Sequence, residues 1–529
     1  MTPPGVSRES ECVMHSDTPS PSDTQQDPHD RSKPPLGRRS FLARAGTGLG
    51  VTALGLGATA AARPEAPART PSFQSGRPIV FRGATVVTGD PQLGVQHNAD
   101  VLVVGSTIRA VGRNVPAPAS AAVIDGRDRI LMPGMIDTHR HMWQTVVRGV
   151  GAEWTIQNYL QWIYKDWSKH WRPEDVYAGN YLSMVEALNS GVTTSLDWSQ
   201  VLHTPEHADA AADALFDSKG RARLAYGNIF APPQEWIGNG DVDRLLRTRF
   251  SSKNQLVTLQ LAWDAPWDTA FPDRPAWEFA RDRDLMVTQH AGVWGFPLDL
   301  GIKILHDNGF LLPTNTYVHA SSLGDDSYRM IADTGGNVSI SAESELNAGQ
   351  GYPPTGKIRR HGIPISLSMD TSVWWSSDMF SAMRATLNAD RGLDHLEAHA
   401  EGKTVHNNDL RTEDVIHYAT QGGANALGLG SSLGSITPGK LADLVLLRAD
   451  TPSMVPLTNP CHQIVFQATR AEVDTVLVDG RVLKYGGELV HPDMKRAKRL
   501  AEASRDHVRD LVGAQEWAQA QDPPAYRVA

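Results

Sequence analysis

The middle of the chain alternates short apolar strands with amphipathic helices, and this alternation restricts the fold more than any other feature. One unit is complete within residues 172–196: Pro173 and two acidic residues open a helix, as the helix dipole favours, and Gly191 ends it. The next strand is predicted over Val192–Leu196, and similar units continue through Ile365–Leu367. Repeated βα units predict a parallel sheet buried by helices, either a closed barrel or an open doubly wound sheet.

A different pattern flanks this region on both sides. Short β-type runs separated by turn residues fill residues 78–132, and similar runs return within 433–490. Because these two segments bracket the long middle, we expect them to form one small β-sandwich domain together. The predicted organisation is therefore a small β-domain from 78–132 and 433–490, a barrel over 133–432, and a C-terminal helical extension over 491–529.

The N-terminal residues are not expected to belong to the folded core. Residues 1–36 are rich in Pro, Ser, Thr and Asp without apolar periodicity, and disorder is predicted there. Residues 37–62 carry Arg38-Arg39-Ser40-Phe41-Leu42 and then an uncharged run, which looks like a twin-arginine export signal cleaved near Ala60–Ala62. The run is rich in glycine and so only weakly hydrophobic for a membrane anchor. We therefore expect the export machinery to deliver the protein to an extracellular or periplasmic location.

Charge and cysteine content exclude several functions. The net charge of −9 and the pI near 6.1 leave no basic surface for nucleic acid. There are only two cysteines, Cys12 and Cys461, and the first lies before the predicted cleavage site. A disulfide framework and a cysteine-based zinc site are thus excluded. Any metal must be held by carboxylates and some of the 19 histidines.

Histidine and aspartate side chains follow the predicted strands at the points where the strands end. Parallel strands of a barrel all end at one face, where active sites are built, so residues far apart in sequence converge there. Neighbours two apart on a strand point the same way, so a His-x-His pair can bind one ion. The candidate groups are His139 and His141 after Gly134–Thr138, His290 after Met286–Gln289, His319 after Thr316–Val318, and Asp370 after Ser366–Met369.

Two motifs resemble a known superfamily. Pro133–His141 resembles the opening metal motif of the amidohydrolase superfamily, and Gly434–Asp443 resembles its return to the small β-domain. Between about Pro78 and Val490 the chain is most similar to the branch with cytosine and guanine deaminases and triazine chlorohydrolases. The resemblance implies a (β/α)₈ TIM-like barrel. It also implies one divalent metal ion, zinc or iron, held by His139, His141, His290 and Asp370. No lysine ends the predicted fourth strand (257–261), so a two-metal site bridged by a modified lysine is not expected.

The expected chemistry is hydrolysis by metal-activated hydroxide. Bound zinc lowers the pKa of its water to roughly 7, and Asp370 would accept that water's proton as the general base. By the family pattern, His319 would polarise the substrate. Deaminases of this branch usually have a glutamate three residues after the third histidine, where this chain has Val293. Glu345 and Glu343 are candidates to replace that acid, although both could instead be acids that pair with a helix dipole.

The proposed substrate is a small cyclic or heteroaromatic compound with a carbon–nitrogen bond to cleave. Hydrolytic removal of chloride from an aromatic substrate remains an alternative, since chloride needs no protonation on leaving. A catalytically weak, exported binding protein is a third reading. The sequence does not determine the oligomeric state, and a homo-oligomer is one possibility. The following residues lie just past or within predicted strands and are expected to contact substrate: Trp143, Trp198, Gln260, Trp263, Trp294, Glu343 and Trp374.

Overall fold

A computed structural model describes residue 73 and residues 76–294, 298–375 and 378–524. All of these belong to one compact unit of the chain, which begins at Arg69. The predicted disordered segment 1–36 and the predicted export signal 37–62 lie outside the described residues. Within the described residues, no helix combines the length and the apolar character that crossing a membrane requires.

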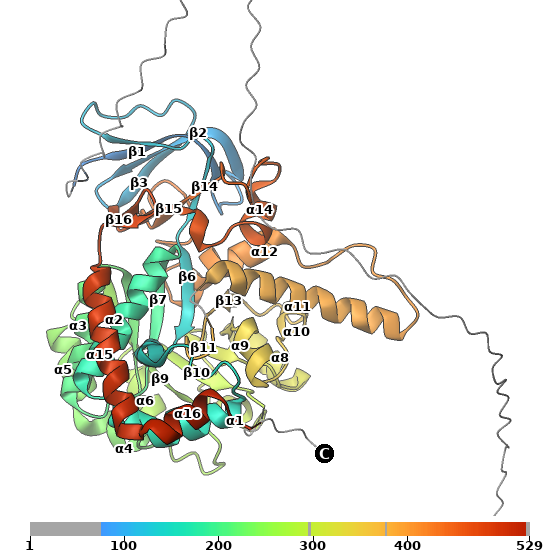
Figure 1. Cartoon of the computed structure of the whole chain (residues 1–529). Helices are drawn as coiled ribbons and strands as arrows, with labels where there is room; N and C mark the ends of the chain where they lie inside the picture. Colours follow the sequence, from blue (N-terminus) through green and yellow to red (C-terminus); the bar gives the residue numbers. More distant parts are fainter. Residues whose placement is uncertain (1–72, 74–75, 295–297, 376–377, 525–529) are drawn as a thin grey trace, which may run out of the picture. The chain divides into compact units, whose positions relative to one another are not determined.

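Eight parallel strands form the central sheet, in the order β13-β12-β11-β10-β9-β8-β7-β6 (Figure 1). Their ends meet after β13, where the Asp370 amide donates to the His139 carbonyl oxygen at 3.0 Å and the His141 amide donates to the Asp370 carbonyl oxygen at 2.7 Å. The predicted barrel is confirmed, and an open doubly wound sheet is excluded. The strands are β6 Met135–Arg140, β7 Val192–Ser199, β8 Arg221–Tyr226, β9 Val257–Asp264, β10 Val287–Ala291, β11 Asn315–His319, β12 Asn337–Ile340 and β13 Ile365–Leu367.

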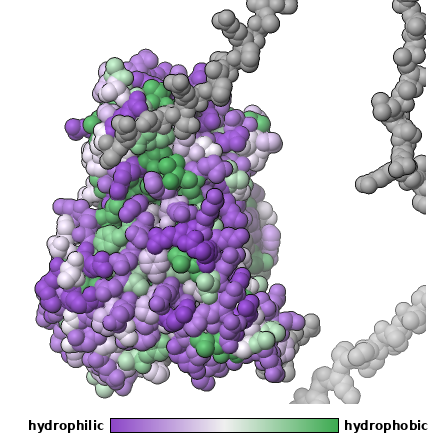
Figure 2. Space-filling view, turned by 60° about the vertical axis from the view of Figure 1, so that its left-hand side comes forward, coloured by the Kyte–Doolittle hydropathy of each residue, from purple (hydrophilic) through white to green (hydrophobic). Residues whose placement is uncertain are grey.

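Helices between these strands cover the outside of the barrel (Figure 1). Helix α2 shows why they form: Pro173 occupies its first turn, and Asp175 accepts a hydrogen bond from the Arg172 amide at 2.9 Å. The α-helices up to β13 are α1 Ile156–Tyr159, α2 Pro173–Asn189, α3 Pro205–Ser218, α4 Pro233–Trp236, α5 Asp241–Thr248, α6 Arg274–Asp282, α7 Leu300–Asp307, α8 Asp325–Thr334, α9 Ala342–Ala348 and α10 Thr355–Arg360. After β13 come α11 Met379–Ala400, α12 Thr412–His417, α13 Gly423–Ala426 and α14 Pro460–Phe466. Figure 2 shows a face on which hydrophilic residues predominate, with hydrophobic patches mainly toward the top of the view.

Both ends of the described chain contribute to a second sheet of nine strands, as predicted. β5 pairs antiparallel with β14, which joins the N-terminal strands to the C-terminal ones. The sheet curls on itself, because Ile108 of β3 and Val482 of β16 share one buried core although they lie near opposite edges. The strands are β1 Ile79–Val87, β2 Val95–Val104, β3 Thr107–Gly112, β4 Ala122–Asp125, β5 Arg129–Pro133, β14 Leu444–Arg448, β15 Val473–Val478, β16 Arg481–Tyr485 and β17 Glu488–Leu489.

Gly134 is the only residue between β5 and β6, and so it links the two sheets. Its amide donates to the Asp443 carbonyl oxygen at 2.9 Å, while a Cβ at this position would collide with the side chain of Thr193. Glycine is required here because the β6 and β7 segments approach too closely to leave room for a side chain. The glycine of the opening motif therefore has a packing role.

The C-terminal helices pack against the 142–171 segment, which connects β6 to α2. These helices are α15 Met494–Val512 and α16 Ala514–Gln521. The ring of Trp517 stacks on Trp167 with 5.2 Å between centroids, and the Trp154 indole N–H donates to the Ala520 carbonyl oxygen at 2.6 Å. The end of the chain thus supports a segment that lies close to the barrel strand ends.

Candidate metal centre

The structure brings His139, His141, His290, His319 and Asp370 together at the carboxyl ends of β6, β10, β11 and β13. Possible ligand atoms of His139, His141 and His290 lie within 4.8 Å of one another, as do those of His139, His319 and Asp370. The Nε2 atoms of His139 and His141 are each 3.3 Å from Oδ1 of Asp370. This is the convergence that the strand-end positions predicted.

The backbone around the cluster is unusual in ways that hold these side chains in place. The φ angles of His319, Ala320 and Asp370 are 69°, 51° and 59°, in the left-handed region that non-glycine residues seldom adopt. The Asp137 carboxylate accepts the amides of His139 at 3.2 Å and Met369 at 3.1 Å. It therefore connects the end of β6 to the residue before Asp370. Backbone strain of this kind persists where the surrounding structure enforces it, which is common at functional sites.

Two of the imidazoles are oriented by carboxylates behind them. Nδ1 of His290 lies 2.8 Å from Asp264 Oδ1, and Nδ1 of His319 lies 3.2 Å from Glu345 Oε1. Because each carboxylate contacts Nδ1, the Nε2 atom of each histidine remains available to bind an ion at the centre of the cluster. A carboxylate on the far nitrogen is the usual support of a metal-binding histidine, because it fixes both the ring and its tautomer.

Several buried polar atoms in the cluster have no partner. Among the described residues, neither ring nitrogen of His139 has a hydrogen-bond partner, and Nδ1 of His141 also lacks one. Buried polar groups are nearly always satisfied, because an unpaired one costs about 1–3 kcal/mol. Imidazole nitrogens beside a carboxylate form the donor set that zinc takes in proteins. The residues present therefore fit a divalent metal ion.

The protonation states also suit a cation. Burial lowers the pKa of His139 well below its ordinary value, which keeps this imidazole neutral. Burial opposes ionisation of Asp370, but the imidazoles of His139 and His141, with Nε2 atoms 3.3 Å from Oδ1, outweigh it and hold the pKa of this carboxyl well below its usual range. Neutral imidazoles and an ionised carboxylate are the forms that bind a metal.

Three of the residues predicted to contact substrate lie beside the cluster or within the barrel. The indole of Trp198 stacks on the His290 ring, with centroids 4.0 Å apart. Gln260 is buried and its Oε1 has no partner among the described residues. The Trp374 indole N–H donates to Ser344 Oγ at 3.1 Å, and that hydroxyl donates in turn to Asp370 Oδ2.

Other predicted contact residues lie away from the cluster. Trp263 packs against Trp236 and Trp277 in the layer between strands and helices. Trp143 is fully buried and forms an edge contact with Trp171. Trp294 is 62% exposed. Glu343 interacts with Asp378 and Arg384, and burial raises its pKa to about 7.

Glu345 lies behind His319 and contacts the cluster through this histidine. Its Oε1 contacts His319 Nδ1 and also accepts the Ser341 amide at 2.9 Å. Its Oε2 is buried and has no hydrogen-bond partner among the described residues. Burial raises the pKa of this carboxyl.

Sequence reasoning missed two tyrosines of the 142–171 segment. Tyr159 is buried at the end of α1, and Tyr164 lies in the π-helix η2, Leu160–Trp167. The negative charges of Asp370 and Asp264 act on both hydroxyls. π-Helical turns are frequent at functional sites, but the sequence carried no periodic signal for this one.

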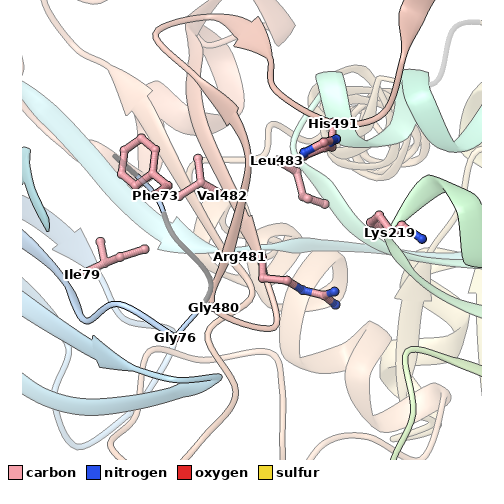
Figure 3. A pocket seen from close by; sticks show the side chains of 9 residues that line it. All are labelled: Phe73, Gly76, Ile79, Lys219, Gly480, Arg481, Val482, Leu483 and His491. Atoms are coloured by element: carbon pink, nitrogen blue, oxygen red, sulfur yellow. The ribbon is translucent and has the colours of Figure 1, made fainter. Parts of the chain in front are cut away.

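Solvent reaches the cluster from the β9–β10 side. The side chain of His290 is 15% exposed and that of its partner Asp264 is 65% exposed. A separate cleft of about 360 Å³ lies at β16 and the end of α3 (Figure 3). None of its lining residues belongs to the metal cluster; they are Phe73, Gly76, Ile79, Lys219, Gly480, Arg481, Val482, Leu483 and His491.

Known proteins resemble the chain over most of its length. A 5-methylthioadenosine/S-adenosylhomocysteine deaminase from Symbiobacterium thermophilum is 30% identical over 426 residues, which cover 77% of this chain and 93% of the relative. A 5′-deoxyadenosine deaminase from Methanosphaera stadtmanae is 27% identical over 399 residues, which cover 73% and 89%.

Solved structures share the fold. An adenosine deaminase from Xanthomonas campestris with bound zinc superimposes with a TM-score of 0.69 at 22% identity, covering 82% of this chain and 98% of the other. A mutant of atrazine chlorohydrolase from Arthrobacter aurescens, complexed with zinc and atraton, gives 0.70 at 22% identity, covering 81% and 100%. A model of the amidohydrolase family matches residues 130–483, which span the barrel and both motifs. The resemblance inferred from those motifs is confirmed, and the chain belongs to the amidohydrolase family.

Proposed function

We propose that the protein is a metal-dependent hydrolase that cleaves a carbon–nitrogen bond in a small cyclic or heteroaromatic compound. One divalent ion would be held by His139, His141, His290 and Asp370, with zinc the first candidate and iron the second. One observation carries the proposal: buried imidazole nitrogens without partners surround an ionised aspartate at the strand ends. This donor set fits a hydrolytic metal.

The side chains around the centre divide the work of hydrolysis. A divalent metal bound there supplies hydroxide at neutral pH by lowering the pKa of a water to roughly 7. Asp370 accepts the proton of the attacking water and later delivers it to the leaving nitrogen. His319 lies beside the centre, where it polarises the substrate atom on which negative charge develops. Glu345 orients the His319 ring through its contact with Nδ1.

The substrate class follows from the aromatic wall and from the relatives. The Trp198 indole stacks on the His290 ring and makes this side of the centre aromatic. The relatives at 27–30% identity are named for deamination of adenosine derivatives. We therefore place amino-substituted purines and related N-heterocycles first among the substrates. Because these relatives are named for deamination, we place removal of an amine before removal of chloride.

The direct test combines metal analysis with product analysis. Purified protein is assayed with aminated purines, pyrimidines and triazines and with their chloro forms, before and after chelation. We expect about one metal ion per chain, ammonia as product, loss of activity on chelation, and its return with Zn²⁺. Release of chloride alone would favour dehalogenation. Absence of any metal-dependent product across the panel would contradict the proposal and favour a binding protein.

We further propose that the protein is exported through the twin-arginine route. The support is sequence alone: Arg38 and Arg39 precede an uncharged, glycine-rich run. Fractionation of cells that express the full chain should find the mature protein outside the cytoplasm. The double substitution Arg38→Lys and Arg39→Lys should retain it inside with residues 1–62 uncleaved. An unchanged location in this variant would refute the assignment.

A further inference from the structure

The site lacks an acid where related deaminases place one. Val293 is buried and cannot donate a hydrogen bond from its side chain. Attack on a heteroaromatic ring places negative charge on a ring nitrogen, and a donor aimed at that atom is worth about 10²–10³ in rate. The Oε1 atom of Glu345 is engaged on the far side of His319, so this oxygen does not supply it. The role is therefore open to another donor that its neighbours already orient.

Tyr159 is well placed to be that donor. Its ring lies against Trp374 with 5.0 Å between centroids, and Trp374 is linked through Ser344 to the Asp370 carboxylate. Its side chain is buried. Burial and the charge of Asp370 raise the pKa of Tyr159 well above its ordinary value, so the hydroxyl keeps its proton at neutral pH.

One hydrogen-bonded chain ends at Tyr164, the aromatic neighbour of Tyr159. The Trp143 indole N–H can only donate, and it donates to Gln200 Oε1 at 3.3 Å. This contact fixes the amide of Gln200, whose Nε2 donates to the Tyr164 hydroxyl. The Tyr164 ring lies against the Tyr159 ring, with 5.3 Å between centroids. This chain therefore holds in place one of the rings that pack against Tyr159.

A second chain reaches Tyr159 from the residue after Asp370. The Val373 amide donates to Thr371 Oγ1 at 3.1 Å, so the Thr371 hydroxyl directs its proton to Gln144 Oε1 at 2.6 Å. The Gln144 amide is therefore fixed, and its Nε2 donates to the Tyr159 hydroxyl at 2.5 Å. Tyr159 accepts this hydrogen bond, and among the described residues none accepts a hydrogen bond from its own O–H.

We propose that the Tyr159 hydroxyl donates a hydrogen bond to a ring nitrogen of the substrate. It would thereby take the role of the glutamate that related deaminases have at the position of Val293. This inference rests on the proposed function. Gln144 is a positioning residue, because it directs the proton of Tyr159 without touching the substrate. The pre-arranged network means that no reorientation is needed as charge develops, which is the condition for effective electrostatic stabilisation.

The test compares Tyr159→Phe with wild type on the 6-amino and 6-chloro forms of one purine nucleoside. The two probes share the ring nitrogens and differ in the leaving group. We expect kcat to fall about 10²-fold on both probes, with KM changed by less than a few fold, because the donor acts on the ring. Metal content and melting temperature should stay at wild-type values. Equal activity in Tyr159→Phe, or a loss confined to the amino probe, would overturn the inference.

Two further variants control for indirect effects. Tyr226→Phe removes another buried hydroxyl, which contacts Leu202 and Asp241 on the outside of β8, and it should leave both rates unchanged. Gln144→Leu keeps the phenol but frees its proton to turn, and we expect a loss of about tenfold on both probes. A wild-type protein inert on the whole panel would instead refute the proposed function, which is a distinct outcome.

Discussion

Two buried charged clusters join segments that lie far apart in the sequence, and they differ in how their hydrogen bonds are used. In the first, Arg221 of β8 holds Asp443 with two contacts, Nε to Oδ2 at 2.8 Å and Nη2 to Oδ1 at 3.1 Å. The Asp479 amide adds a third at 2.7 Å. Charge and hydrogen-bonding capacity are matched within the protein, as expected of a structural ion pair.

The metal centre is arranged in the opposite way. His139 and His141 have ring nitrogens without partners among the described residues, and Asp370 sits at a strained backbone position. A fold gains nothing from such groups unless a ligand completes them. The difference shows how the two kinds of cluster can be distinguished. In the structural cluster the charged groups find their hydrogen-bond partners within the protein, whereas in the functional cluster several buried groups have none among the described residues.

The largest expected effect comes from Asp370→Asn. Asparagine tolerates the left-handed conformation and keeps the shape, but it cannot accept the proton of water. We expect kcat to fall about 10²–10⁴-fold while most of the metal is retained. The free energy of unfolding should change by less than about 1 kcal/mol. Turnover at the wild-type rate, measured by ammonia release, would show that another residue is the base.

The reciprocal substitution is Asp443→Asn in the structural cluster. It leaves the buried Arg221 without its full partner, and breaking a buried pair costs about 3–5 kcal/mol. Denaturant unfolding should show this loss. The rate per folded molecule should equal wild type, since the pair lies away from the metal ligands. If the variant were stable but inactive, the division into structural and functional clusters would fail.

The sequence predicted that the ligand-type residues converge, which the structure shows, but it did not predict their surroundings. The ligand-type residues were predictable because parallel strands end at one face, so position along the chain determined their place. Trp263 shows the limit of that rule. It follows Gln260 by three residues on β9, so the two side chains lie on opposite faces of the strand and only one can face the barrel interior.

Tyr159 and Tyr164 could not be predicted for a different reason. Their segment has neither a period of two nor a steady helical period. Trp167 of its π-helix stacks on Trp517 from the other end of the described chain, and the local sequence does not indicate this contact. The hydrogen bonds that make Tyr159 an acceptor involve Gln144 and Thr371, and nothing in a linear sequence places these side chains beside Tyr159.

A smaller effect is expected from Asp264→Asn, which alters the support of one ligand. The introduced amide can still contact His290 Nδ1, but it lacks the negative charge with which the Asp264 carboxylate orients the imidazole ring. Loss of such a partner typically costs about 10–100-fold in metal affinity. Competition with a chromogenic chelator measures this directly. Asp284→Asn is the control, because its carboxylate pairs with Lys253 at the surface. Equal affinity in both variants would argue against His290 as a ligand.

The smallest effect is expected from Trp517→Ala in the C-terminal helices. The stacked pair with Trp167 should contribute about 0.5–1.5 kcal/mol beyond the area it buries. We expect a fall of a few degrees in melting temperature and a loss of activity of less than tenfold, with unchanged metal content. A loss as large as that of Asp370→Asn would mean that α16 belongs to the active site and does not merely support the 142–171 segment.

The most direct measurement is a crystal structure of the protein purified with its metal, with anomalous scattering used to locate the ion. The account predicts one ion at the carboxyl end of the barrel, about 2.0–2.2 Å from nitrogens of His139, His141 and His290 and from an oxygen of Asp370. An ion bound elsewhere, or a pair of ions that leaves Asp370 uncoordinated, would contradict it.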